Sequence, residues 1–218
     1  MRASKWLRAI RRWWRKGSGD GVFINTSGLG VLAEGVHLSA DQARPGDRIL
    51  LSGPIGDHGI AILAQREGLE FESAIESDSA PLHSLVAAML AASTEIRAMR
   101  DPTRGGLSSA LNELAAHANV GIEIDERAIP VREEVKGACE MLGLDPLYVA
   151  NEGKLVAIVA PGVEDRVLAA MRRHPLGQEA ALIGMVTAAH PRLVTMRTRV
   201  GPSRVVDMIA GDQLPRIC

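Results

Sequence analysis

The strongest constraint on the fold is the alternation of short apolar runs with amphipathic helical patterns. The clearest case is the apolar run KLVAIVAP (residues 154–161), which is followed almost directly by VEDRVLAAMRRH (163–174). The first run is typical of a buried strand, and the second places its apolar side chains at helical spacing. Strands that alternate with helices pack as a sheet with helices against it, so the sequence predicts an α/β fold.

The same pattern extends along most of the chain. In SDSAPLHSLVAAMLAAS (77–93) we expect a helix that Ser79 caps and that holds Pro81 in its first turn. The last eight residues show no periodicity and are expected to form a tail. The other expected strands are 21–32 with a turn, 49–51, 96–100, 121–124, 180–187 and two around a Gly-Pro turn within 192–208; the other expected helices are 58–69, 107–118 and 130–144.

Composition and charge exclude several classes of protein. Only 3% of the 218 residues are aromatic while 46% are hydrophobic, so aliphatic side chains must build the core. No apolar run has the length of a membrane span, no secretory signal is recognisable, and two cysteines do not make a disulfide framework. A net charge of −1 does not favour nucleic-acid binding. We therefore expect a cytoplasmic protein with no nucleic-acid or membrane partner.

The basic residues are unevenly distributed. The first sixteen residues, MRASKWLRAIRRWWRK, hold seven of the 25 Lys and Arg residues, all three Trp residues and no acid. Such a segment is typical of an amphipathic helix that binds a membrane surface or a nucleic acid. The alternative is that the segment is not native protein sequence.

The stretch RDPTRGGL (100–107) joins an expected strand to an expected helix. Gly105 and Gly106 allow the backbone to approach a ligand closely, and the helix that follows offers free N–H groups to an anion. Arg104 adds a fixed positive charge, and Asp101 could bind a metal or cap the loop. The alternative is an ordinary connection with Asp-Pro as its turn, which the spacing slightly favours.

Two further loops carry candidate residues. In YVANEGKLVAIV, Asn151 and Glu152 precede a very apolar strand, where a carboxylate could transfer a proton, bind a metal or simply lie in a solvated turn. In GPIGDHGI, Asp57 and His58 lie between glycines at a strand-to-helix junction. His58 could act as a base or contact a phosphate, although a capping role is the commoner outcome.

The chain ends in PRIC, so Cys218 is its last residue. Its own carboxylate raises the pKa of the thiol, and Arg216 offsets this in part. A prenylation signal is excluded because that signal places Cys fourth from the end. The other cysteine, Cys139, falls within an expected helix, where packing is the better interpretation.

Taken in order along the chain, these stretches resemble the HypE family of hydrogenase maturation carbamoyl dehydratases. HypE belongs to the superfamily of ATP-dependent enzymes that includes aminoimidazole ribonucleotide synthetase and selenophosphate synthetase. The resemblance covers residues 16–218 and rests on GDRILLSGPIGDHGIAIL, REGLEFES, MRDPTRGGL, ALNELA, LGLDPLYVANEGKLVAIV and the terminal PRIC. It implies the C-terminal domain of the synthetase-like fold, a mixed sheet with packed helices and a mobile C-terminal tail.

The resemblance also implies an activity. The partner HypF, a carbamoyltransferase, would place a carbamoyl group on Cys218, and ATP-dependent dehydration would convert it to a thiocyanate. The cyano group would then pass to iron on the HypC–HypD scaffold as a ligand of the [NiFe] centre. The cofactors would be ATP and Mg²⁺, and no resident metal site is implied. Glu152 would be the base, Pro215, Arg216 and Ile217 would dock the tail, and Asp101, Arg104, Gly105, Gly106, Asn151 and His58 would lie near the nucleotide phosphates.

The sequence departs from the family at its start. The family has an N-terminal domain that supplies much of the Mg-ATP site and the interface of its homodimer, and only its last strand, around 22–32, is recognisable here. We therefore expect four parts: an aberrant basic leader (1–19), a remnant of the N-terminal domain (20–44), the C-terminal synthetase-like domain (45–200), and a strand with a mobile tail (201–218).

We expect that the leader arises from a change of reading frame. The family has GDTKVVEKG where this chain has AIRRWWRKG. Codons can be chosen for KWLRAIRRWWRK that, in another frame, encode VVTGDTKVVEK, and the unique Trp codons limit that choice. The hypothesis is that the leader is family sequence translated in the wrong frame.

Two functions remain open from the sequence. The chain could act as the ATP-dependent dehydratase, or it could be a truncated carrier whose tail accepts a carbamoyl group without dehydrating it. A sister enzyme such as selenophosphate synthetase has no use for a terminal PRIC.

Overall fold

The structure, a computed structural model, describes residues 35–69 and 75–208. The described residues from Gly35 onward belong to one compact unit. Within these ranges no helix has the length and apolarity needed to cross a bilayer. The expected strand at 21–32, the leader and the last eight residues lie outside the described residues.

Seven strands form a single mixed sheet in the part of the chain that the structure describes, in the order β2-β4-β1-β5-β3-β6-β7. All neighbours are antiparallel except β3 and β6, which are parallel. The predicted mixed sheet with packed helices is therefore confirmed. The strands are β1 (Arg48–Leu51), β2 (Ile96–Arg100), β3 (Gly121–Asp125), β4 (Val156–Val159), β5 (Ala181–Thr187), β6 (Val194–Arg197) and β7 (Ser203–Val205).

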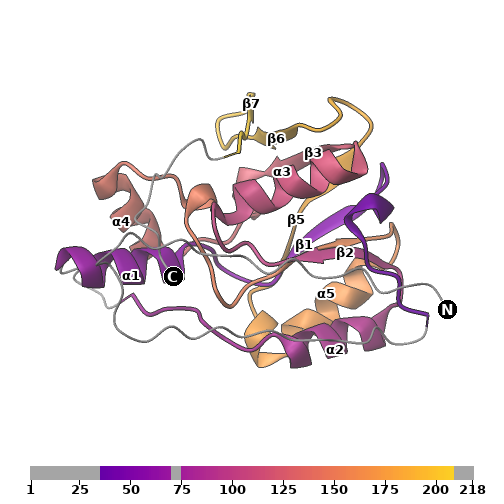
Figure 1. The fold of residues 1–218 in the computed structure, drawn as a ribbon, viewed down its shortest axis with the longest axis horizontal. Coiled ribbons are helices and arrows are strands. Elements are labelled where there is room, and N and C mark those ends of the chain that lie inside the picture. The colour runs from indigo at the N-terminus through magenta and orange to yellow at the C-terminus, as the bar shows by residue number, and fades with distance from the viewer. Residues whose placement is uncertain (1–34, 70–74, 209–218) are drawn as a thin grey trace, which may run out of the picture. The chain divides into compact units, whose positions relative to one another are not determined.

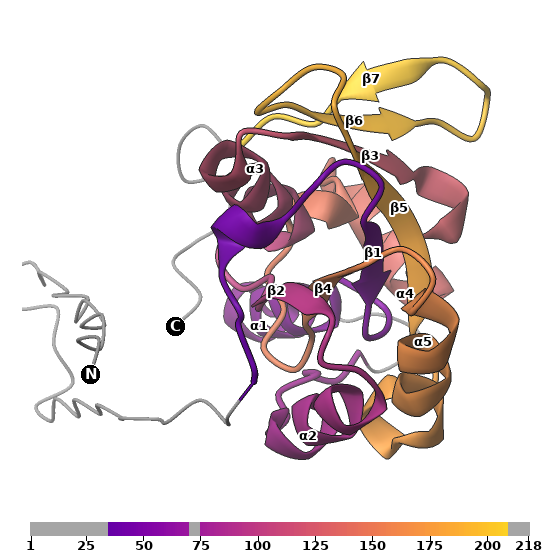
Figure 2. The same cartoon turned by 90° about the vertical axis from the view of Figure 1, so that its right-hand side faces the viewer.

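The helices lie on both faces of the sheet (Figures 1 and 2). α2 and α5 lie side by side on one face, α3 covers the other, and α1 and α4 lie together at one end. Five helices are described: α1 (Asp57–Glu67), α2 (His83–Ala92), α3 (Gly106–Ala118), α4 (Glu133–Leu142) and α5 (Glu164–Arg173). The described residues also form short 3-10 helices outside these elements: η1 (Ala40–Gln42), η2 (Glu126–Ala128), η3 (Pro146–Tyr148) and η4 (Pro175–Gly177).

The continuous apolar runs in the sequence result from strands that are buried on both faces. All four residues of β4 are fully buried. Val156 and Ile158 belong to the core cluster on the α3 side, whereas Ala157 and Val159 belong to the cluster beneath α2 and α5. This two-residue period divides the core into two layers, and it explains why the run shows no polar alternation.

The start of α2 differs from the prediction. The helix begins at His83 after Leu82, and no side chain caps it. Ser79 and Pro81 precede the helix and take no part in it, so the predicted cap and first turn are wrong. The physical reason is that residues 77–79 are held by another loop, through contacts described below, and so are not available to form the first turn.

The other predicted elements are found within a few residues of their expected positions. α1 ends at Glu67, and the next residue, Gly68, adopts a left-handed conformation with φ 64° that glycine tolerates without strain. α4 begins at Glu133, so Val131 precedes it rather than lying in its first turn. β6 and β7 form the expected antiparallel pair around a turn that contains Gly201 and Pro202.

Candidate functional site

Sheet topology brings the three candidate loops to the same edge. β1 and β2 both pair antiparallel with β4, so their last residues lie beside the first residue of β4. Leu51 pairs with Val156 on one side, and Arg100 pairs with Val156 on the other. The loops that follow β1 and β2 therefore meet the loop that precedes β4. We call this meeting of residues 52–59, 101–106 and 149–154 the loop junction.

Asn151 is the centre of the loop junction and is fully buried. Its Oδ1 accepts a hydrogen bond from the Gly56 N–H at 2.8 Å. Its Nδ2 donates to the carbonyl oxygens of Pro102 at 2.9 Å and Val149 at 3.1 Å. Both N–H groups of the amide are thus used within the protein, and Asn151 joins the three loops instead of presenting donors to a ligand.

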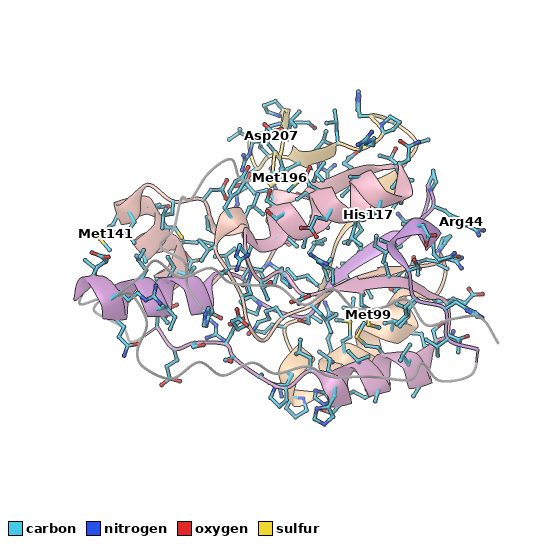
Figure 3. All side chains as sticks on the ribbon, viewed as in Figure 1. Arg44, Met99, His117, Met141, Met196 and Asp207 are labelled. Atoms are coloured by element: carbon cyan, nitrogen blue, oxygen red, sulfur yellow. The ribbon has the colours of Figure 1, made fainter. Side chains whose placement is uncertain are left out.

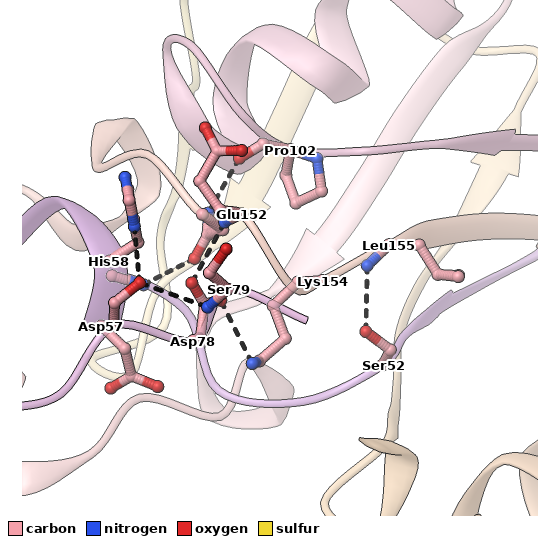
Figure 4. A network of polar contacts seen from close by, with 12 residues as sticks. Ser52, Asp57, His58, Asp78, Ser79, Pro102, Glu152, Lys154 and Leu155 are labelled. Atoms are coloured by element: carbon pink, nitrogen blue, oxygen red, sulfur yellow. Dashed lines mark hydrogen bonds and ion pairs between the residues drawn. The ribbon is translucent and has the colours of Figure 1, made fainter. Parts of the chain in front are cut away.

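Glu152 follows Asn151 and is exposed. Its main-chain N–H donates to Oδ1 of Asp78 at 3.1 Å, while its carboxylate points away from Asp78 and Lys154 (Figure 4). Lys154 Nζ lies 3.1 Å from Oδ2 of Asp78 in an ion pair whose two side chains are 11% and 3% exposed. The loop therefore exposes the Glu152 carboxylate, while the buried Asp78 carboxylate binds the main chain of Glu152 and the side chain of Lys154.

The same short segment contacts His58. The Nδ1 of His58 lies 2.8 Å from the hydroxyl of Ser77, and that hydroxyl accepts a hydrogen bond from the Ser79 N–H at 3.2 Å (Figure 4). His58 is 9% exposed, so burial and this hydrogen bond account for its presence between the glycines. Residues 77–79, which we call the strap, thus join the His58 loop to the Glu152 loop.

Asp57 is buried beside His58 at the start of α1. Its Oδ2 accepts no hydrogen bond from the described residues, and its ion pair with Arg132 measures 3.8 Å. Burial raises the pKa of the Asp57 carboxyl, and the positive charges of Arg132 and Lys154 offset this rise only in part. Asp57 is therefore a poorly compensated charge within the loop junction.

The DPTRGG loop leads into α3 as predicted. Asp101 and Arg104 are exposed, whereas Gly105 and Gly106 are buried with φ 74° and 62°. A Cβ on Gly106 would lie 2.4 Å from the Leu147 carbonyl oxygen and 2.7 Å from that of Val149. Gly106 therefore permits a close backbone approach to the loop before β4. The predicted approach of a ligand to this glycine stays a prediction.

The segment that leads to the C-terminus is attached to α3. The Ser108 hydroxyl donates to the Asp207 carbonyl oxygen at 2.6 Å, and the Asn112 side chain donates to that of Val206 at 2.8 Å. Asp207 accordingly lies beside α3, above that helix in the view of Figure 3. Cys218 and the predicted docking residues Pro215, Arg216 and Ile217 lie outside the described residues.

Sequence reasoning missed Asp78, Ser77 and Lys154. The Ser77 and Asp78 positions were assigned to a helix start, because Ser and Pro ahead of an apolar run are typical of one. Contacts between residues so distant in sequence leave no periodic signal. Within the described ranges, no group of three or more His, Cys, Asp and Glu side chains could hold a metal ion.

Comparisons with known proteins agree with this fold. Residues 44–195 match the domain family "AIR synthase related protein, C-terminal domain", so the chain belongs to that family. Within it, the predicted resemblance to HypE is confirmed. The carbamoyl dehydratase HypE of Azotobacter vinelandii is 65% identical over 202 residues, which make up 93% of this chain and 59% of that protein.

Solved structures give the same result. HypE in its complex with HypF superposes with a TM-score of 0.80 at 44% identity, over 83% of this chain and 58% of that one. HypE in complex with ATP has a TM-score of 0.78 at 47% identity, over 83% of this chain and 55% of that one. The chain thus spans less than two thirds of the length of the relatives it matches.

Proposed function

We propose that this chain acts in [NiFe]-hydrogenase maturation by ATP-dependent dehydration of an S-carbamoyl group on Cys218 to a thiocyanate. The observation that carries the proposal is the 65% identity with a carbamoyl dehydratase HypE over 93% of the chain. That similarity covers the loop junction, whose three loops carry the sequence motifs of the family.

The chemistry requires a base at a fixed position. Bound ATP would supply the phosphoryl group that makes the amide oxygen a leaving group. Phosphorylation of the oxygen would release ADP and one of the two N–H protons. Glu152 is the candidate to accept the other proton, so that the carbon–oxygen bond breaks, phosphate leaves and a carbon–nitrogen triple bond forms. Its exposed carboxylate stands on a loop whose main chain is held by Asn151 and Asp78, which favours this role.

The carrier thiol is proposed to be Cys218, and the state of the second cysteine supports this. Cys139 is 1% exposed, and burial raises the pKa of its thiol to about 11. Because the thiolate is the nucleophile, Cys139 is protected from carbamoylation. Cys218 lies ten positions after Met208, and a fully extended chain of ten residues spans at most about 33–36 Å.

The start of α3 fits a phosphate group. α3 has 13 residues, and its N-terminus offers the positive end of the helix dipole beside the exposed Arg104. Gly105 and Arg104 would therefore hold the ATP phosphates, with Asp101 at the edge of the site. His58 and Asn151 are proposed to support the phosphate site indirectly. His58 would do so through its contact with the strap, and Asn151 by joining the three loops.

The partners and remaining ligands follow from the same family. We propose HypF as the carbamoyl donor, because a relative's structure is a complex of HypE with HypF. Transfer of the cyano group to iron on HypC–HypD, a requirement for Mg²⁺, a cytoplasmic location and a homodimer stay predictions. The division of the chain into four parts at residues 19, 44 and 200 and the reading-frame origin of the leader also stay predictions.

Intact mass tests the proposal directly. The purified full chain is incubated with HypF, carbamoyl phosphate and ATP, and its mass is followed over time. We expect the mass to increase by one carbamoyl group and then to decrease by one water, with both changes on Cys218. Cys218→Ser should show neither change, and Glu152→Gln should keep the first and lose the second. A carbamoyl group that persists on the unaltered chain would contradict dehydration.

A second candidate function is that of a carrier, which accepts the carbamoyl group without dehydrating it. The sequence leaves this function open, because the Cys218 thiol can accept the group without a nucleotide bound to the chain. Binding of ATP distinguishes the two candidates. Calorimetric titration with ATP should detect binding to a dehydratase, whereas a carrier would take up the carbamoyl group and bind no nucleotide.

A further inference from the structure

The strap contacts the Glu152 loop at three consecutive residues. Asp78 accepts the hydrogen bond from the Glu152 N–H at 3.1 Å, and its other carboxylate oxygen lies 3.1 Å from Lys154 Nζ. Between these residues, Gly153 passes so close that an added Cβ would lie 1.7 Å from the Asp78 carbonyl oxygen. Glu152, Gly153 and Lys154 are therefore all fitted to one residue that lies 74 positions away from Glu152 along the chain.

From this arrangement we propose that Asp78 is the positioning residue for Glu152. The inference rests on the proposed function, in which Glu152 accepts the amide proton. Asp78 does not reach the reacting atoms in this proposal, because its carboxylate is turned toward Lys154 and the main chain (Figure 4). It acts by fixing the main chain from which the Glu152 side chain extends.

The chemistry of the contact suits a positioning role. A carboxylate that binds a main-chain N–H fixes the backbone more strongly than a neutral acceptor does. Burial of both ion-pair partners makes the pair sensitive to the loss of either one, because the remaining charge would be left uncompensated. The exposed Glu152 carboxylate meanwhile makes no contact with this pair, so Asp78 can orient it without consuming its proton-accepting capacity.

The strap also links the two halves of the loop junction. Ser77 contacts His58 while Asp78 contacts the Glu152 loop, so one short segment spans from the start of α1 to the start of β4. A displacement of the strap would therefore move Glu152 relative to the loop that holds His58. We assign the positioning role to Asp78 rather than to Lys154 because Asp78 accepts the hydrogen bond from the Glu152 N–H, whereas Lys154 pairs with Asp78 and lies beside Gly53.

A pair of double variants isolates the Asp78 contact. Asp78→Asn with Lys154→Met and Asp78→Ala with Lys154→Met both remove the ion pair without leaving a buried charge. They differ at residue 78 alone, where Asn keeps an acceptor for the Glu152 N–H and Ala has none. We measure two quantities in the full chain: the exchange rate of the ¹⁵N-labelled Glu152 amide, and the rates of carbamoyl gain and water loss by intact mass.

The expected result is a selective effect of the Ala variant. Its Glu152 amide should exchange about tenfold faster than that of the Asn variant, the ratio that one hydrogen bond supplies. Its water loss should slow by about the same factor, while carbamoyl gain is equal in the two variants. Asp125→Asn, which removes the carboxylate of a surface pair with Arg197, is the matched charge control and should change neither quantity.

Each other outcome has one meaning. Equal exchange in the two double variants would overturn the inference, and so would unequal exchange with equal water loss. Unequal exchange in a chain that never loses water, even unaltered, would support placement of Glu152 by Asp78 and overturn only the proposed function. Gly153→Ala supplies a second approach, since its Cβ must displace the strap without changing any charge. An unchanged exchange rate of the Glu152 amide in this variant would also count against the inference.

Discussion

The layer of α2 and α5 and the loop junction are both buried, but they are held together by different forces. In the helical layer, Leu85, Met89 and Met171 are fully buried against apolar residues of the sheet. In the loop junction the central buried side chain is Asn151, which makes three hydrogen bonds to three different segments. Apolar contacts are not directional, whereas hydrogen bonds fix distance and angle.

The difference shows how the fold separates stability from positioning. Apolar packing tolerates substitutions that keep the volume, so the helical layer can vary without moving the sheet. The loop junction has no such tolerance, because a buried donor or acceptor that loses its partner retains its full desolvation cost. The candidate base Glu152 is attached to the second kind of region.

The largest effect is expected from Asn151→Ala. This change leaves the buried Gly56 N–H and the Val149 carbonyl oxygen without their partner and removes a contact to Pro102. We expect a loss of about 3–5 kcal/mol in the free energy of unfolding, as the sum of two or three unsatisfied buried groups. Urea denaturation measures it, and water loss from carbamoylated Cys218 should fall together with stability.

Asn112→Ala is the matched control for the loss of an asparagine. Asn112 also donates two hydrogen bonds, but one is within its own helix and it is 9% exposed. We expect a smaller loss, about 1–2 kcal/mol. If Asn112→Ala cost as much as Asn151→Ala, the special position of Asn151 at the centre of three loops would be disproved.

A smaller effect, confined to stability, is expected in the helical layer. Leu85→Ala creates a cavity at a fully buried position and should cost about 3 kcal/mol, whereas Leu85→Met keeps the volume and should cost about 1 kcal/mol. Neither variant should change the rate of carbamoylation or of water loss at a temperature where the chain is folded. A change in either rate would show that the two regions are coupled.

The sequence predicted the helical layer and most of the fold because both depend on local periodicity. The run LVAIV indicated a buried strand, and β4 is buried on both faces. The candidate loops were also found, because Gly, Asp and Asn next to apolar strands are typical of turns that carry function. What the sequence could not supply was the partner of each loop.

Asp78 is the clearest case of this limit. Serine and proline around it resemble a helix start, and only the antiparallel pairing of β1 and β2 with β4 brings the loops together where the strap can hold them. Asn151 was identified, but as a ligand contact, because the sequence cannot show that its two N–H groups are already used. Long-range hydrogen bonds are thus the part of the site that local patterns do not encode.

The smallest expected effect is on the pH dependence of stability, and it distinguishes the buried carboxyl of Asp57 from the surface carboxyl of Asp125. Burial raises the pKa of the Asp57 carboxyl above its ordinary 3.8, so its contribution to stability is complete below that pH and is lost as pH rises through the raised value. At Asp125 the hydrogen bond from Arg197 lowers the carboxyl pKa instead, so its contribution is present above 3.8 and is lost as pH falls.

Asp57→Asn and Asp125→Asn should therefore change the pH dependence of stability in opposite directions. Relative to the unaltered chain, Asp57→Asn should gain stability as pH rises from about 3 to 7, because it removes the cost of ionising a buried carboxyl whose Oδ2 accepts no hydrogen bond from the described residues. Asp125→Asn should lose stability over the same range. Urea denaturation of both variants at a series of pH values measures the two slopes. Slopes of the same sign would mean that neighbouring positive charges stabilise the ionised Asp57 carboxylate in solution. The loop junction would then stabilise a buried carboxylate as effectively as Arg197 stabilises Asp125 on the surface.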